Sequence, residues 1–124
     1  MTHYFYRDRT GTLQFDGTPP QWFSDMCTLM DIEKNWRQGI PRMIEISGKS
    51  RSHLIHSMKK YLGTTPTDFI NERRLQCAER LLRISGLPVA DIYMISGFEN
   101  ESWFYKKFKE RYGETPDKYR SSHS

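Results

Sequence analysis

The chain repeats a pattern of apolar, basic and turn residues at a separation of fifty residues. The matched pairs are Leu54/Phe104, Met58/Phe108, Lys59/Lys109, Gly63/Gly113, Thr65/Thr115, Pro66/Pro116 and Phe69/Tyr119. Just upstream, Ile46-Ser47-Gly48 returns as Ile95-Ser96-Gly97. One copy is too short to bury a core alone, and each has the order of a helix-turn-helix: short helix, glycine turn, second helix. The repeat therefore predicts an all-α chain with two such units.

The first twenty residues differ from the rest. Two glycines, Gly11 and Gly17, and the pair Pro19-Pro20 indicate an extended segment with turns. We interpret residues 1–20 as a linker or the remnant of a preceding domain. The remaining length suits one domain. No apolar run reaches the length of a membrane span and the N-terminus does not resemble a signal peptide, so we expect a cytoplasmic protein without a membrane partner.

From Gln21 onward the apolar residues recur at helical spacing. We predict seven helices, at about 21–37, 41–47, 51–62, 66–84, 88–95 and 100–112, and one turn after Pro116 before a serine-rich tail at 121–124. Ser50 and Thr65 are suitable N-caps, and Gly48 suits the turn. The helix at 66–84 has a length of about 26–29 Å. Successive major-groove faces of B-DNA are ~34 Å apart, so the two units can reach neighbouring grooves.

The predicted helix at 51–62 has the face of a DNA-reading helix. With Leu54, Met58 and Leu62 inside, its opposite face is polar or basic, and residues 49–60 contain no acid. Short side chains approach base edges and long cations reach phosphates. We predict base contacts from Ser52, Ile55 and His56, and phosphate contacts from Arg51, Lys59 and Lys60. The alternative for Ile55 is a half-buried helix residue without a DNA contact.

The second predicted reading helix, at 100–112, buries Phe104, Phe108 and Tyr112 and has a more mixed outer face. Trp103 lies at its margin and is assigned to the core in preference to a base contact. Its predicted base contacts are Glu101, Ser102, Tyr105 and Lys106. Its predicted phosphate contacts are Lys107 and Lys109, with Arg73 and Arg74 added from the long helix; Arg111 adds positive charge.

Charge is distributed unevenly in a way that agrees with these assignments. The net charge is +4, but residues 1–40 carry four basic and five acidic side chains, whereas residues 41–124 carry fifteen and ten. Such a balance favours a polyanionic partner without proving one.

The residues of both copies, taken in register, resemble the AraC/XylS family of transcription regulators. The motifs that carry the resemblance are Ser50-Arg51-Ser52-His53-Leu54, Met58-Lys59-Lys60, Gly63-Thr64-Thr65-Pro66, Arg74-Leu75, Ala78, Leu81-Leu82, Gly97-Phe98, Phe108-Lys109 and Gly113-Glu114-Thr115-Pro116 with Tyr119-Arg120. Three core positions, Ile44, Met58 and Tyr93, depart from the family pattern. These departures change the volume of core side chains, so we expect them to affect packing and not DNA binding.

The resemblance implies a DNA-binding domain over residues 21–120, with helix-turn-helix units at about 41–62 and 88–112. It also implies double-stranded DNA and RNA polymerase as partners, and a small-molecule effector bound through a separate domain. The sequence from Trp22 to Asn71 resembles that of regulators of chitooligosaccharide or cellobiose operons. We therefore expect an activator of a sugar-utilisation operon.

Other classes fit less well. His53, His56, Glu45 and Asp68 can be drawn as an acid–base set, but no nucleophile elbow, phosphate loop or metal quartet is present in the sequence. We therefore predict no enzyme activity and no cofactor. Cys27 and Cys77 lie far apart and suit reduced thiols within helices. A helical module whose basic faces bind an acidic protein remains the alternative function.

Overall fold

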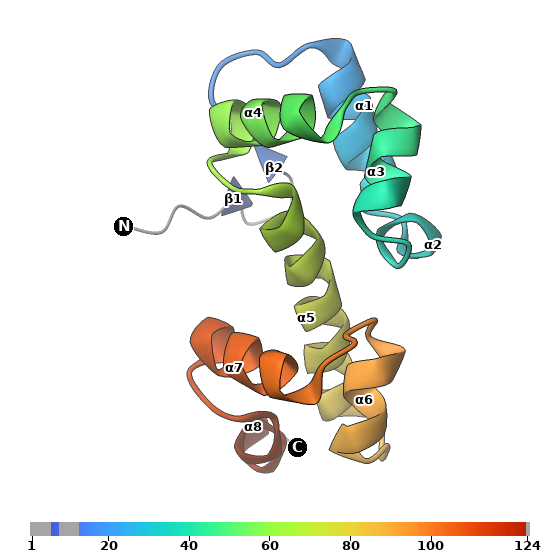
Figure 1. The fold of residues 1–124 in the computed structure, drawn as a ribbon. Helices are drawn as coiled ribbons and strands as arrows, with labels where there is room; N and C mark the ends of the chain where they lie inside the picture. Colours follow the sequence, from blue (N-terminus) through green and yellow to red (C-terminus); the bar gives the residue numbers. More distant parts are fainter. Residues whose placement is uncertain (1–5, 8–12, 124) are drawn as a thin grey trace. The chain divides into compact units, whose positions relative to one another are not determined.

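A computed structural model describes residues 6–7 and 13–123 of the chain, and these fall into two compact units that divide between Asn71 and Glu72 (Figure 1). The fold is all-α, as predicted. The helices of the described residues are α1 (Gln21–Met30), α2 (Glu33–Trp36), α3 (Ile40–Ser47), α4 (Arg51–Leu62), α5 (Pro66–Ile84), α6 (Val89–Ile95), α7 (Glu101–Tyr112) and α8 (Pro116–His123). Two short strands, β1 (Tyr6–Arg7) and β2 (Leu13–Gln14), pair in antiparallel fashion. The other residues of the predicted extended segment, 1–5 and 8–12, lie outside the described part.

The first predicted helix is wrong as a single element, because it divides into α1 and α2. The backbone of Ile32 is extended, with φ −78° and ψ 129°. The Asn35 side-chain amide, which is buried, donates to the Leu29 carbonyl at 2.8 Å. The Leu29 carbonyl lies in the last turn of α1, and it also accepts from the Ile32 N–H at 3.1 Å. The turn brings Trp36 into the core, and the described helices number eight instead of seven.

The predicted tail is also wrong, because α8 continues to His123. Two residues of α8 are bonded to α5 and to the residues just after it. Tyr119, which is buried, donates its hydroxyl to Glu79 at 2.5 Å. Arg120 donates to the carbonyls of Leu82 and Ser85. Tertiary bonds therefore hold a helix that the serine content at its end does not favour.

The first unit buries a methionine-rich core. Its fully buried side chains come from α1, α3, α4 and α5 and include Phe23, Met26, Met30, Met43, Leu54, Met58 and Phe69. The chain just before α1 belongs to this unit, because the Asp16 N–H donates to the Tyr61 carbonyl at 2.9 Å. The Phe15 ring also packs edge-on against Phe23, with centroids 6.0 Å apart. The described part of the predicted linker is therefore attached to α4.

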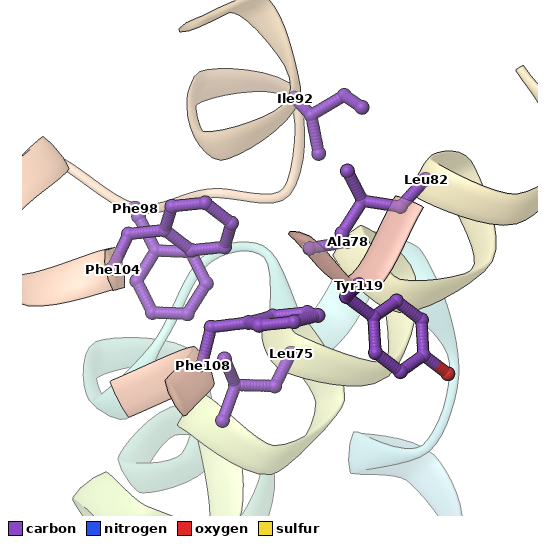
Figure 2. Packing of buried hydrophobic residues seen from close by; sticks show 8 residues of the cluster. All are labelled: Leu75, Ala78, Leu82, Ile92, Phe98, Phe104, Phe108 and Tyr119. Atoms are coloured by element: carbon purple, nitrogen blue, oxygen red, sulfur yellow. The ribbon is translucent and has the colours of Figure 1, made fainter. Parts of the chain in front are cut away.

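The second unit buries an aromatic core between α5, α6, α7 and α8 (Figure 2). Phe108 lies between Phe104 and Tyr119, with ring centroids 5.8 and 5.3 Å away. The whole cluster consists of Leu75, Ala78, Leu82, Ile92, Phe98, Phe104, Phe108 and Tyr119. The inward assignment of Phe104 and Phe108 is confirmed, since both are fully buried.

Helix caps fix where the two predicted reading helices begin and end. The Ser50 hydroxyl accepts from the His53 N–H at 3.2 Å, which confirms Ser50 as the N-cap of α4. The Asn100 side chain does the same for α7, accepting from the Trp103 N–H at 2.8 Å. Each cap satisfies a backbone donor that a helix start leaves unpaired. Both helices end at a left-handed glycine, Gly63 or Gly113.

Candidate nucleic-acid interface

The outer face of α4 is exposed along its whole length, as the sequence predicts. Leu54, Met58 and Leu62 are buried on the opposite face. Ile55 is 46% exposed, so part of its side chain is accessible at the surface. The exposed set contains Arg51, Ser52, Ile55, His56, Lys59 and Lys60, with no acid among them. This face therefore offers cations, hydroxyl and imidazole groups and one apolar side chain, which together match base edges and phosphates.

The start of α4 is held by an aromatic contact. The His53 ring packs edge-on against Trp22 of α1, with centroids 5.4 Å apart. The Lys49 ammonium lies 5.1 Å from the centre of the same indole. His53 is nevertheless exposed. Its ring therefore supports the beginning of the helix, in agreement with a structural or phosphate-facing histidine and not with an acid–base pair.

The outer face of α7 is exposed at Glu101, Ser102, Lys106 and Lys109. Tyr105 is half-buried, and its hydroxyl donates to Asp117 of α8 at 2.9 Å. Burial, together with the bond and the charge of Asp117, raises the pKa of Tyr105 to about 12. The hydroxyl therefore keeps its proton at neutral pH and is already engaged within the protein.

The assignment of Trp103 to the core is wrong, because its side chain is 41% exposed. The ammonium groups of Lys107 and Lys106 lie 4.5 and 5.8 Å from its ring centre. Lys107 also forms an ion pair of 3.5 Å with Glu110 and is half-buried. The repeat could have indicated this exposure, because the residue equivalent to Trp103 in the first copy is His53, which is exposed on α4. Trp103 thus adds an aromatic surface to α7 beside two cations.

The arginines on and beside α5 are less accessible than the predicted phosphate contacts require. Arg73 is only 3% exposed, and this burial contradicts a phosphate contact made by its guanidinium at the surface. Arg74 is half-buried, and its side chain lies against the turn at Gly97. Arg111 of α7 holds Glu72 of α5 through Nε, at 2.9 and 3.1 Å from the two carboxylate oxygens. Of these three arginines, Arg73 is excluded from the surface by burial, Arg74 stays partly accessible, and Arg111 is ion-paired with Glu72.

Within residues 6–7 and 13–123, no three or more His, Cys, Asp or Glu side chains are grouped to hold a metal ion. Over the same residues, no helix combines the length and the apolar character needed to cross a membrane. Cys27 is buried and Cys77 half-buried, as expected for thiols within helices.

Comparison with known proteins places these features in one family. A family model described as a helix-turn-helix domain matches residues 43–122, more than half of the chain. A transcriptional regulator of Pseudomonas aeruginosa, ExsA, is 38% identical over 92 residues, covering 74% of this chain and 29% of its own. The xylose operon regulatory protein of Escherichia coli is 31% identical over 85 residues, with 68% and 22% covered.

Solved structures agree with the sequence comparison. The C-terminal domain of the response regulator yesN from Fusobacterium nucleatum superposes with a TM-score of 0.68 at 27% identity, covering 79% of this chain and 97% of that domain. The chain spans about a third or less of the length of the first curated relatives that it matches. The chain therefore belongs to the AraC/XylS family of DNA-binding helix-turn-helix transcription regulators.

Proposed function

We propose that α4 and α7 enter successive major grooves of double-stranded DNA and read two unlike half-sites. The observation that carries this proposal is the exposed, acid-free outer face of α4, opposite a fully buried apolar face. An ordinary solvated helix mixes charges of both signs, whereas a groove-reading helix needs an outer face without net negative charge, because phosphates lie on both sides of the groove. The domain limits of the proposal remain residues 21–120, with reading units at 41–62 and 88–112.

The proposed contacts divide into base-reading and phosphate-binding residues. On α4, His56 and Ser52 supply hydrogen-bonding groups, and Ile55 supplies an apolar contact suited to a thymine methyl. On α7, Lys106 suits guanine and Glu101 suits the amino group of cytosine. The base set is Ser52, Ile55, His56, Glu101, Ser102, Tyr105 and Lys106, and the phosphate set is Arg51, Lys59, Lys60, Arg74, Lys107 and Lys109. Arg73 is left out because it is buried.

The two half-sites should lie one helical turn apart. The 19 residues of α5 give it a length of about 28 Å at 1.5 Å per residue. That length suits the ~34 Å separation of successive major-groove faces on one side of B-DNA. The outer faces of α4 and α7 differ in charge and shape, so the proposed site is not a palindrome.

The wider role is a proposal too. We infer that the chain is part of a cytoplasmic, nucleoid-associated activator of a sugar-utilisation operon. RNA polymerase and an effector bound by a further domain complete the proposed partners. Support for the sugar comes from the resemblance of residues 22–71 and from one relative, whose name describes a xylose operon regulator.

Binding is tested first by fluorescence anisotropy of a labelled random duplex across a salt series. The proposal predicts micromolar binding or better at low salt and a linear fall of log affinity with log salt. An acidic protein partner is the competing explanation for the basic faces. Undetectable affinity at low salt, or affinity without a salt slope, contradicts the proposal and favours that alternative.

Base reading is tested with His56→Ala and Lys106→Ala on a selected site. Each should relax preference at one position, at a cost of about 1–3 kcal/mol. Lys118→Ala, an exposed lysine of α8 outside the proposed set, is the matched control. An equal loss for all sequences would reassign His56 or Lys106 to phosphate contact.

A further inference from the structure

Tyr105 and Asp117 join the outer flank of α7 to the first turn of α8. The tyrosine hydroxyl donates to Asp117 Oδ2 at 2.9 Å. Asp117 is the second residue of α8, after Pro116, where the positive end of the helix dipole favours a carboxylate. The pKa of Tyr105 is raised to about 12, mainly by burial and then by Asp117, so the donor proton persists at working pH. The bond connects the reading helix α7 to α8 at the surface of this unit.

The repeat supplies a comparison within the same chain. At a separation of fifty residues, Tyr105 corresponds to Ile55 and Asp117 to Thr67. In the first unit the isoleucine has no polar group with which to form the corresponding hydrogen bond. Ile55 and Thr67 line an open recess of about 280 Å³, whose walls are Ile40, Arg51, Ile55, Thr65, Pro66 and Thr67. At equivalent positions of the repeat, the first unit therefore has an open recess beside α4, and the second has a tyrosine–carboxylate hydrogen bond beside α7.

The difference bears on how each reading helix meets DNA. Ile55 is 46% exposed, with no polar group to orient it. Tyr105 is half-buried, and its hydroxyl is directed to α8. The hydroxyl has already donated its one proton within the protein, so it cannot donate to a base, and the ring that it fixes presents a constant shape.

We propose that Asp117 is a positioning residue for DNA reading, which holds the Tyr105 ring at a fixed orientation beside the base pairs of the α7 half-site. The proposal rests on the proposed function of α7 as a reading helix. Helix α8, which lies outside the helix-turn-helix unit, then contributes to specificity through Tyr105. In the first unit the equivalent hydrogen bond cannot form, because Ile55 has no polar group to donate to Thr67.

The test measures affinity for the site selected by the native chain and for duplexes with single base-pair changes in each half-site. Asp117→Ala and Tyr105→Phe should each reduce discrimination in the α7 half-site by about three- to tenfold, the range of one lost hydrogen bond. Because both remove the same bond, the double variant should lose no more than either single one. Asp117→Asn keeps an oxygen acceptor and should retain most of the discrimination.

Thr67→Ala is the matched control in the first unit and should leave both half-sites unchanged. Each variant is checked for a native melting curve; if Asp117→Ala melts early, Tyr105→Phe, which removes the same bond, decides the outcome. Unchanged discrimination in Asp117→Ala, or an equal loss in both half-sites, overturns the positioning role. Failure of the native chain to select any site is a different result, which overturns the proposed function itself.

Discussion

The turn before α7 depends on a glycine whose replacement has a calculable cost. Gly97 has φ +96°, a conformation that residues with a Cβ rarely adopt. An added Cβ would lie 3.1 Å from Nε and 3.5 Å from Cδ of Arg74. The repeat offers a control at Gly48, where φ is +68° and an added Cβ meets nothing within 4 Å. Alanine at the two positions therefore separates backbone strain from close contact.

The expected penalties follow from these two terms. Positive φ costs a residue with a Cβ roughly 1–2 kcal/mol, and this term applies to both Gly48→Ala and Gly97→Ala. Overpacking adds about 1–3 kcal/mol, at the lower end here because the Arg74 side chain can shift by a few tenths of an ångström. We expect a loss of roughly 2–3 kcal/mol for Gly97→Ala and roughly 1–2 kcal/mol for Gly48→Ala.

Urea unfolding followed by circular dichroism measures both losses. A third comparison introduces Gly97→Ala into an Arg74→Ala background, which removes the crowded side chain. The penalty there should fall to the Gly48→Ala value. Equal losses at the two glycines, or an undiminished penalty in the Arg74→Ala background, would refute the close-contact argument.

Three further changes test other parts of the structure. Phe108→Ala should cost about 3–5 kcal/mol by leaving a cavity in the second core, measured as a lower urea midpoint; an unchanged midpoint contradicts its burial. Lys59→Ala should reduce the slope of log affinity against log salt by about 1, measured by anisotropy, if Lys59 contacts a phosphate. Burial raises the pKa of Glu79, but hydrogen bonds from Arg83 and Tyr119 outweigh it, and the net pKa is lowered. The stabilisation from a lowered carboxyl pKa is present above the unfolded-state value and is lost as pH falls through the folded-state value, so Glu79→Gln should flatten the acid limb of stability against pH.

Most of the fold could be predicted because the repeat and the caps specify it locally. Ser50 is an N-cap by residue type, and Leu54, Met58, Phe104 and Phe108 are buried as their spacing predicts. Local signals failed where tertiary contacts decide. The break between α1 and α2 depends on a side-chain bond from Asn35, which helical periodicity does not reveal.

The outer faces of α4 and α7 could be predicted in outline, because the spacing of the apolar residues determines which face of each helix is buried. Individual arginines could not, since a helical pattern does not distinguish a cation at the surface from one enclosed by its neighbours. Arg73 is buried, and Arg111 is bound to Glu72, which lies 39 residues earlier in the chain. The hydrogen bond from Tyr105 to Asp117 likewise joins two helices. The residue spacing within one helix does not predict such a bond.

The central claim is that one chain reads two unlike half-sites through α4 and α7. Selection of bound sequences from a random duplex library tests it most directly. The account predicts a non-palindromic consensus with two blocks of preferred bases, centred about 10 base pairs apart. It further predicts that His56→Ala alters only one block and Lys106→Ala only the other. A single block, a palindrome or no enrichment would contradict the account.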